Sequence, residues 1–529
     1  MHNNSDDGKN NGKDSGVPAP SGNGQQVPRS PRSFARFTGA QKRALELGLA
    51  TALDVLGRAP EGSYGRVAGV LERFAHDDNK RVVAEWVRNY LSPGSPGAAW
   101  LKHLLTSVHP NVRRHFVAQF TTHVLFNDGQ GTYRLPDGRT VGVLPAMVIS
   151  PTMRCNLACV GCYAGSYTKK DDLTPAEVER VIGEARDMGT RFFVVTGGEP
   201  LMYEPLFDIF AKFDDCAFQM YTSGHLMTAE KAKRIVELGN VVPAVSVEGF
   251  QEETDYRRGP GGYDRVMRAF DLLREARAMY SFSATVTRKN IDVVTSDVFC
   301  QAMVDKGCHY GWFFSYMPIG RNPDISLMPT PEERNRSRIA VNSFRKCFPI
   351  LVADFWNDGA FTEGCLSAGR KYVHINNHGD VEPCVFSHFA VDNIREKSLA
   401  ECLASDYFVA MRKAAPYGRN LLRPCPIIDH PKVLRTLVRR YGARPTHAGA
   451  ESVLTGEVAE HLDRYAEELE NIYDPVWAEE YRWAARLHSY PPYDFSKYPP
   501  RKGAASEQPA ATESSGSESS GSEVGAAAS

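Results

Sequence analysis

Apolar residues recur along the chain in two different patterns. Between about residues 38 and 128 they return every three or four positions, the period of a helix with one buried face. This spacing predicts helices at 40–57, 64–77, 80–91, 98–108 and 112–126. Pro and Gly clusters such as 92–97 separate them. We therefore expect a helical N-terminal domain over residues 36–128, used for packing or dimerisation or, alternatively, as a substrate lid or docking module.

From residue 146 onward, short apolar runs rich in β-branched residues alternate with helical stretches. They predict strands at 146–152, 191–197, 217–223, 241–247, 281–287 and 310–318. Helix signals lie between the runs: Thr174 to Glu177 form a capping box, and a helix that begins at Thr228 ends at Gly239. Six such units predict a parallel sheet, whose ligands bind at the carboxyl ends of the strands.

The remaining segments are more irregular. An Asp137-Gly138 turn predicts a hairpin over 129–145, and alternation at 372–376 predicts another, which turns at His378-Gly379. One amphipathic helix is expected at 398–416, with Cys402 buried, and C-terminal helices are expected over 436–500. His447 and Glu451, in a loop between those helices, are expected to be solvated. Residues 1–35 and 501–529 have few large apolar residues and are predicted to be disordered.

Composition narrows the class of protein. The 529 residues include 62 Lys and Arg against 63 Asp and Glu, so no net charge favours nucleic acid. The absence of an 18-residue apolar run and of a secretory signal pattern predicts a cytoplasmic protein without a membrane partner. Eleven cysteines, an odd number, indicate metal ligation in a reducing compartment rather than a disulfide framework.

Three of the cysteines are closely spaced after the first predicted strand. Cys155, Cys159 and Cys162 form Cys-x3-Cys-x2-Cys, a spacing that lets one loop offer three thiolates to three irons of a cuboidal cluster. The fourth iron would stay open to another ligand. A zinc knuckle or three unrelated thiols are the alternatives, but zinc usually takes four ligands and no fourth Cys or His lies nearby.

The triad, the aromatic Tyr163 that follows it and the later Gly197-Gly198-Glu199-Pro200 together resemble the radical S-adenosylmethionine (SAM) superfamily. The resemblance implies an α/β fold, a partial (β/α)6 barrel over 146–325. It also implies that the open iron of a [4Fe–4S] cluster binds SAM and that SAM is reductively cleaved to a 5′-deoxyadenosyl radical, which abstracts hydrogen from a substrate. A flavodoxin- or ferredoxin-type protein would donate the electron.

The same resemblance suggests which residues bind SAM. Glu199 would contact the amino group of SAM, and other strand ends would offer hydroxyls and carboxylates to its ribose and carboxylate. These SAM candidates are Tyr163, Gly197, Gly198, Glu199, Pro200, Thr222, Ser223, Ser246, Glu248 and Arg258. Glu248 departs from the family's usual Ser-x-Asp-Gly, and either Arg257 or Arg258 could face the SAM carboxylate. Thr285, Thr287 and Arg288 are weaker candidates.

A second set of cysteines follows the barrel. Cys365, thirteen residues, Gly379, four residues and Cys384 resemble the opening of SPASM/twitch domains, and Cys425 would be the third ligand. We expect a small cysteine-rich domain over 345–435 with one auxiliary [4Fe–4S] cluster. The closing Cys-x2-Cys of that pattern is missing. The fourth ligand could be Asp429, His430, Cys347 or Cys402, or it could be absent, leaving an iron open to substrate; a zinc ribbon-like site or no metal is the alternative.

The resulting functional hypothesis is a radical SAM enzyme that acts on a small polyhydroxylated or glycosylated molecule. If the auxiliary cluster accepts an electron, the product is dehydrogenated. If a cysteine thiol returns hydrogen, the product is an epimer, and Cys308 and Cys347 are candidate donors. The alternatives are a peptide-modifying maturase, a non-catalytic iron–sulfur protein and a zinc enzyme.

Overall fold

The computed structural model describes residues 39–65, 88–122, 131–481 and 484. The disorder predicted at 1–35 and 501–529 lies outside these residues, as do most of the helices predicted at 64–77 and 80–91. Within the described ranges, no helix combines the length and the apolar character that crossing a bilayer requires.

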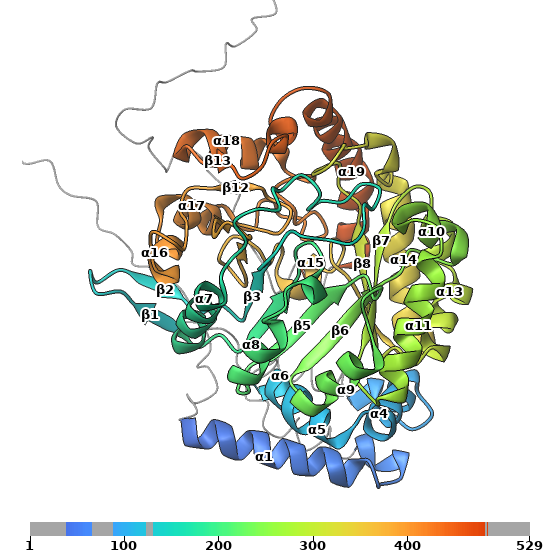
Figure 1. The fold of residues 1–529 in the computed structure, drawn as a ribbon. Coiled ribbons are helices and arrows are strands. Elements are labelled where there is room, and N and C mark those ends of the chain that lie inside the picture. The colour runs from blue at the N-terminus through green and yellow to red at the C-terminus, as the bar shows by residue number, and fades with distance from the viewer. Residues whose placement is uncertain (1–38, 66–87, 123–130, 482–483, 485–529) are drawn as a thin grey trace, which may run out of the picture. The chain divides into compact units, whose positions relative to one another are not determined.

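A parallel sheet organises the chain from residue 146 onward (Figure 1). Its central strands are those predicted: β3 (Ala146–Ile149), β4 (Phe192–Val195), β5 (Ala217–Thr222), β6 (Val241–Ser246), β7 (Ser281–Val286) and β8 (Tyr310–Ser315). Neighbouring strands in this order pair in parallel. Most of their apolar side chains are buried, as expected for a sheet covered by helices. The predicted α/β fold class, a partial barrel, is confirmed.

The sheet has nine strands rather than the six predicted, because both edges are extended. β9 (Leu351–Asp354) pairs in parallel with β8. At the opposite edge β10 (His374–Ile375) pairs in parallel with β3, and β11 (Val381–Glu382) returns antiparallel as the predicted hairpin. β10 and β11 have two residues each, too few positions for a hydrophobic period to be read. The cysteine-rich segment thus completes the sheet instead of standing apart from it.

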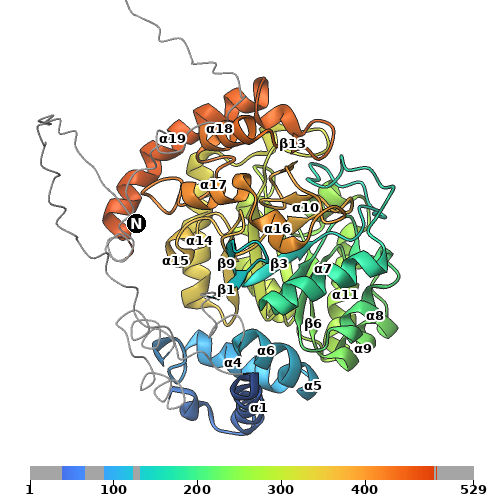
Figure 2. The ribbon, with the colours of Figure 1, turned by 90° about the vertical axis from the view of Figure 1, so that its left-hand side faces the viewer.

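Helices that connect the strands cover the outside of the sheet (Figures 1 and 2). They are α7 (Pro175–Met188), α8 (Leu206–Lys212), α9 (Ala229–Leu238), α10 (Gln251–Arg258), α11 (Gly262–Glu275), α12 (Ile291–Val294), α13 (Asp297–Asp305) and α14 (Pro331–Cys347), with 3-10 turns η4 (Pro200–Met202) and η5 (Ile325–Leu327). The predicted start signals are confirmed: Thr174 and Glu177 form a reciprocal capping box, and Thr228 caps α9, which ends at Gly239.

N-terminal helices pack against the amino ends of the strands. They are α1 (Gly39–Leu56), η1 (Glu61–Ser63), α4 (Pro96–Ser107), α5 (Pro110–Val112), the π-helical η2 (Arg113–Val117) and α6 (Ala118–Phe120). The Trp100 indole donates to the carbonyl of His309, which precedes β8, at 2.7 Å. The ring of Phe120 lies 5.0 Å from that of Phe192 in β4. These contacts represent the packing role considered for this segment.

Two further predictions have different outcomes. The hairpin of β1 (Thr132–Arg134) and β2 (Thr140–Gly142) is confirmed, and Gly138 adopts φ +88° in its turn. The single helix predicted at 398–416 is wrong, because the chain forms α16 (Leu399–Leu403) and then α17 (Asp406–Ala414). The Ser405 hydroxyl caps the second helix by accepting from Phe408 N. Cys402 is buried, as predicted.

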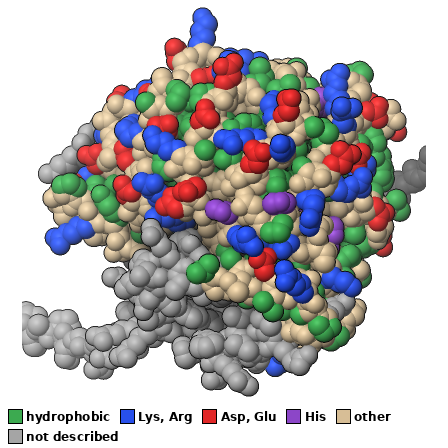
Figure 3. Space-filling model, turned by 60° about the horizontal axis from the view of Figure 1, so that its bottom comes forward, with side chains coloured by type: hydrophobic (Ala, Val, Ile, Leu, Met, Phe, Trp, Pro, Cys, Tyr) green, Lys and Arg blue, Asp and Glu red, His purple; other side chains and the backbone are tan. Residues whose placement is uncertain are grey.

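The C-terminal part packs on α14 and on the cysteine-rich segment. Its elements are α18 (Pro431–Tyr441), β13 (Arg444–Pro445), η6 (Ala450–Val453) and α19 (Glu457–Glu480), and the cysteine-rich segment itself contains α15 (Gly359–Thr362) and β12 (Phe389–Ala390). Arg338 of α14 donates to Glu480 of α19 at 2.7 Å. On the face in Figure 3, acidic and basic side chains are intermixed over the described part, in keeping with the near-zero net charge.

Candidate functional site

The Cys155, Cys159 and Cys162 side chains line one cavity of about 300 Å³ inside the barrel. The loop that carries them follows β3, and the cavity also reaches the carboxyl ends of β4 to β8. The Cys155 sulfur accepts a hydrogen bond from Leu157 N at 3.4 Å. Burial raises the pKa of Cys155 to about 11, so the metal-free thiol is neutral near pH 7 and would lose its proton on binding iron.

The glycines after β4 bring two loops into contact. A Cβ atom at Gly198 would lie 2.2 Å from the carbonyl oxygen of Arg154, and one at Gly197 would lie 2.3 Å from that of Thr152. In their place, Gly198 N donates to Thr152 O and Glu199 N donates to Arg154 O. These glycines therefore let the backbone after β4 approach the cysteine loop closely, which fixes that loop against the end of β4.

Substituting Gly198 with alanine is expected to displace the cysteine loop. Because the new Cβ meets backbone rather than a flexible side chain, the loop must shift, and displacements near 1 Å can cost about 100-fold in rate. Bound iron and 5′-deoxyadenosine formation should both fall, as measured by iron analysis and chromatography. Gly183→Ala in α7 is the matched control, since beyond its chain neighbours and the backbone of its own helix nothing lies within 4 Å of the new Cβ; iron loss in that variant as well would contradict this account.

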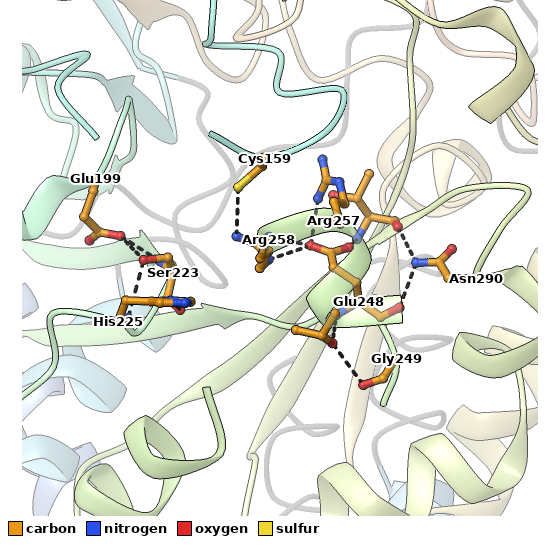
Figure 4. Close-up of polar contacts among 11 residues, drawn as sticks. Cys159, Glu199, Ser223, His225, Glu248, Gly249, Arg257, Arg258 and Asn290 are labelled. Carbon is orange, nitrogen blue, oxygen red and sulfur yellow. Dashed lines mark hydrogen bonds and ion pairs between the residues drawn. The ribbon is translucent and has the colours of Figure 1, made fainter. Parts of the chain in front are cut away.

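Glu199 is buried at the end of β4 and organises the end of β5 (Figure 4). Its Oε1 accepts from the Thr222 hydroxyl at 2.7 Å. Its Oε2 accepts from Ser223 N at 2.8 Å and from the Ser223 hydroxyl at 2.7 Å. The three candidates predicted from separate strand ends thus form one hydrogen-bonded group on the cavity wall. The carboxylate also supplies negative charge where a cationic ammonium group could bind.

Glu248 is fully buried and holds both candidate arginines (Figure 4). Arg257 Nη1 lies 2.7 Å from Glu248 Oε1, and Arg258 binds the same oxygen through Nε at 3.0 Å and through Nη2. Burial opposes ionisation of Glu248, but the two guanidinium groups outweigh it and hold its pKa below the ordinary value. The trio carries one net positive charge beside the cavity, which suits the carboxylate of SAM.

The two arginines differ in what remains available for a ligand. Arg258 Nη1 lies 4.0 Å from the Cys159 sulfur, so this guanidinium group contacts both the Glu248 carboxylate and the Cys159 thiol. Arg257 Nε has no hydrogen-bond partner within the described ranges although it is buried. This unpaired donor and the glycine contacts indicate that the residues present fit SAM beside a cluster.

Other SAM candidates lie on or near the same wall. Tyr163 and Ser246 line the cavity, and the Tyr163 hydroxyl bonds that of Thr196 at 2.9 Å. Thr285 lines it as well, and its backbone N–H donates to Glu248 Oε2. Pro200, Thr287 and Arg288 do not line it. The grouping brings strand ends β4 to β7 to one place, as a parallel sheet predicts.

Sequence reasoning missed the deeper, aromatic part of this cavity. Its ring-bearing side chains are Phe192, Tyr221, Trp312, Phe314, Phe355, Tyr372 and Phe386. Polar side chains there are few and include Gln219 and Ser283. Alternate positions of the strands carry several of these residues, and that period-two pattern was the available signal. Phe355, Tyr372 and Phe386 come from the cysteine-rich segment, so no local pattern could place them here.

A second, smaller cavity of about 30 Å³ is lined by Cys365, Cys384 and Cys425. The Cys384 sulfur lies 2.9 Å from the Tyr372 hydroxyl, and the Cys365 sulfur lies 3.0 Å from the Ser367 hydroxyl. The Cys425 sulfur accepts from Ile427 N at 3.4 Å. Three thiols from separated parts of the chain therefore converge, as the donor set of an iron–sulfur cluster requires.

None of the four predicted fourth ligands lines this second cavity. Asp429 is buried in an ion pair with Arg334, and His430 Nε2 lies 2.9 Å from the carbonyl of Arg423. Cys347 is exposed at the end of α14, and Cys402 is buried in α16. Across the described chain, no three or more His, Cys, Asp or Glu are arranged to hold a single metal ion.

The two cavities share a wall. The residues that line both cavities are Met317, Phe355, Leu366, Tyr372 and Phe386. The ring of Phe386, two residues after Cys384, lies 5.3 Å from the ring of Tyr163, which follows Cys162. Each cysteine group is thus next to an aromatic residue, and these two rings are in contact across the wall.

The remaining candidates lie elsewhere. Cys308 is buried before β8, and neither it nor Cys347 lines either cavity. The hydrogen-donor prediction for these two thiols therefore has no geometric support. Glu451 is exposed, as expected. His447 is not solvated as predicted: it is buried, with Nε2 at 2.6 Å from His388 Nδ1.

Comparisons with known proteins agree with these features. The family described as Radical SAM superfamily matches residues 149–289, and the SPASM iron-sulfur cluster-binding domain matches 365–426. An AdoMet-dependent heme synthase from Oleidesulfovibrio alaskensis is 26% identical over 50% of this chain and 76% of its own. An Fe-coproporphyrin III synthase from Methanosarcina barkeri is 27% identical over 41% and 57%, and a PqqA peptide cyclase from Rhizobium meliloti is 25% identical over 49% and 73%.

Among solved structures, SuiB from Streptococcus suis bound to the precursor peptide SuiA aligns with a TM-score of 0.43. The two sequences are 17% identical, and the alignment covers 50% of this chain and 66% of that protein.

Proposed function

Because the chain belongs to the radical SAM superfamily and carries a SPASM iron–sulfur domain, we propose that it oxidises a substrate whose reacting part is apolar or aromatic. Hydrogen would be abstracted in the large cavity, an electron would leave towards the second, and the resulting cation would lose a proton to give the unsaturated product. The observation that carries this proposal is the wall shared by the two three-cysteine cavities.

The cofactors are SAM, the [4Fe–4S] cluster that binds it and an auxiliary iron–sulfur cluster. Cys155, Cys159 and Cys162 would hold the first cluster, and the Cys365, Cys384 and Cys425 group would hold the second. When bound, SAM and the first cluster supply a hydrogen-abstracting radical, and the second cluster supplies a one-electron acceptor.

The chain's own residues would orient SAM by charge. Glu199 places a carboxylate on the cavity wall where the SAM amino group could bind. On the other side, Glu248 fixes Arg257 and Arg258, so that their net positive charge faces the SAM carboxylate. Arg257 keeps an unpaired Nε for this purpose, and Arg258 also reaches Cys159. Opposite charges at two ends would fix the direction of the bound amino acid moiety.

The lining supports an apolar reacting group over a polyhydroxylated one. Each hydroxyl buried without a hydrogen-bond partner costs free energy, and the aromatic walls offer few partners. Two donors at the cavity, Gln219 Nε2 and Trp312 Nε1, have no partner in the described part of the chain. We infer that they receive a neutral acceptor such as a carbonyl oxygen. The remaining surface suits a flat or unsaturated group.

The positions of the cysteines support oxidation of the substrate over its epimerisation. An epimerase of the kind considered above would need a thiol in the cavity to return hydrogen to the substrate. All eleven cysteines are among the described residues, and six belong to the two triads. The other five line neither cavity: Cys216, Cys300, Cys308, Cys347 and Cys402.

Iron porphyrins are the first compounds to test, because they are flat and unsaturated and because several similar proteins are named for making them. The protein should be loaded with both clusters anaerobically and given SAM, dithionite and Fe-coproporphyrin III. We expect 5′-deoxyadenosine to form with an oxidised product, and deuterium to pass from labelled substrate into the nucleoside. The similarity to a peptide cyclase makes a peptide library the second arm.

The auxiliary site provides the decisive variant. Cys384→Ala is expected to keep 5′-deoxyadenosine formation within a few-fold while the oxidised product is lost. If the variant forms that product at the parent rate, electron transfer towards the second cavity is wrong. If neither substrate class increases nucleoside formation above the substrate-free rate, the substrate proposal is wrong.

A further inference from the structure

The second cavity has three thiols and no fourth Cys, His, Asp or Glu in its lining. An auxiliary [4Fe–4S] cluster held there has four irons, so one iron needs a ligand of another kind. Four residues with a side-chain hydroxyl line the cavity: Thr362, Ser367, Tyr372 and Ser387. The hydrogen bonds of these four hydroxyl groups differ and indicate which one is free to bind iron.

Three of these oxygens are already engaged. The Thr362 hydroxyl donates to the carbonyls of Asp358 and Gly364, at 3.2 and 3.0 Å. The Ser367 hydroxyl lies 3.0 Å from the Cys365 sulfur, and the Tyr372 hydroxyl lies 2.9 Å from the Cys384 sulfur. The last two are therefore placed to donate hydrogen bonds to thiolates that bind iron, a contact that tunes a cluster without ligating it.

Ser387 differs from the other three. Its side chain is 2% exposed, and its hydroxyl has no hydrogen-bond partner within the residues that the structure describes. Leaving a buried hydroxyl unpaired is unfavourable, so a ligand bound in the cavity that Ser387 lines together with three cysteines would supply the missing partner. The backbone already fixes its place: Ser387 N donates to Cys384 O at 2.9 Å, and the two residues form an isolated bridge.

We propose that Ser387 is the fourth protein ligand of the auxiliary cluster. When the cluster assembles, the Ser387 O–H bond breaks, an Fe–O bond forms and the proton leaves to solvent, as it does when thiols bind metal. An alkoxide is a harder donor than a thiolate and stabilises ferric iron, so the cluster has a more negative potential than an all-thiolate one. The assignment depends on the auxiliary cluster and not on the substrate proposed above.

The test isolates the auxiliary cluster in the full-length chain. Cys155, Cys159 and Cys162 are first replaced with alanine, so that iron and electron paramagnetic resonance (EPR) signals come from the second site alone. Ser387→Ala and Ser387→Cys are compared in this parent, and Ser367→Ala is the matched control. Cyanide serves as a probe of an open iron in the reduced protein.

We expect cyanide to leave the parent and Ser367→Ala EPR spectra unchanged and to change that of Ser387→Ala. Ser387→Cys should keep the parent's iron content and shift the midpoint potential to a less negative value. Cyanide binding to the parent would mean an open iron and would overturn the proposal, as would a Ser387→Ala spectrum that cyanide leaves unchanged. If Ser387→Ala loses its cluster, Ser387→Cys decides, and an unshifted potential there rejects serine as a ligand.

Discussion

Replacing Cys162 with alanine is expected to abolish formation of 5′-deoxyadenosine from SAM. The Cys162 sulfur lines the large cavity with two other thiols, and a cluster that loses one of three ligands is not held in the loop. The fold should survive, because alanine retains the Cys162 carbonyl, which accepts from Gly165 N and Arg321 N. Chromatography of the nucleoside and iron analysis measure the two effects together.

The control for this experiment is Cys347→Ser. Cys347 is the exposed thiol at the end of α14 and lines neither cavity, so nucleoside and iron should both stay at the parent level. Nucleoside formation that persists in Cys162→Ala would exclude the loop as the SAM-cluster site. If Cys347→Ser instead keeps the nucleoside but changes the stereochemistry of the product, the hydrogen-donor prediction for that thiol would be supported after all.

The central sheet was predictable because its signals are local. Each of the six strands is an apolar run, and start signals mark two of the helices between them, the capping box at Thr174 and the cap at Thr228. The edge strands β10 and β11 have two residues each, and they exist because β10 pairs with β3 across a long stretch of sequence and β11 pairs with β10. The break between α16 and α17 had a local signal, the Ser405-Asp406 pair, which the amphipathic pattern overrode.

In the candidate site, too, the features with a local sequence signal were predictable and the contacts between distant residues were not. Cysteine spacing and the glycine motif indicated the chemistry, because a cluster loop is a local arrangement of ligands. The partners that hold those residues were not predictable: Glu248 binds two arginines from α10, and His447 pairs with His388, 59 residues earlier in the chain. An expected fourth cluster ligand, Asp429, proved to be half of an ion pair with Arg334 of α14. Such pairings depend on tertiary packing.

Breaking that ion pair is expected to destabilise the cysteine-rich segment strongly. Arg334 Nη1 lies 2.5 Å from Asp429 Oδ1, and both side chains are 0% exposed. Arg334 Nη2 also donates to the carbonyls of Trp356 and Leu422, so one guanidinium joins three parts of the chain. Arg334→Met leaves Asp429 charged and buried without its partner, at a cost of about 3–5 kcal/mol in the free energy of unfolding.

Denaturant unfolding of Arg334→Met measures this loss, and Arg336→Met is the matched control on the same helix. The Arg336 and Asp292 pair is 2.9 Å long but its side chains are 51% and 81% exposed, so its removal should cost about 1 kcal/mol or less. Combining Arg334→Met with Asp429→Leu should recover part of the stability, because the uncompensated charge is removed. Equal losses in the two single variants would contradict the structural role given to Arg334.

The same ion pair links stability to the auxiliary site. Asp429 Oδ2 accepts from Cys425 N at 2.8 Å, so the carboxylate fixes the backbone of one of the three cysteines. The double variant loses that acceptor even where it regains stability. We therefore expect it to fold yet to bind less auxiliary iron than the parent. Full auxiliary iron in the double variant would show that Asp429 supports the fold alone and has no part in positioning Cys425.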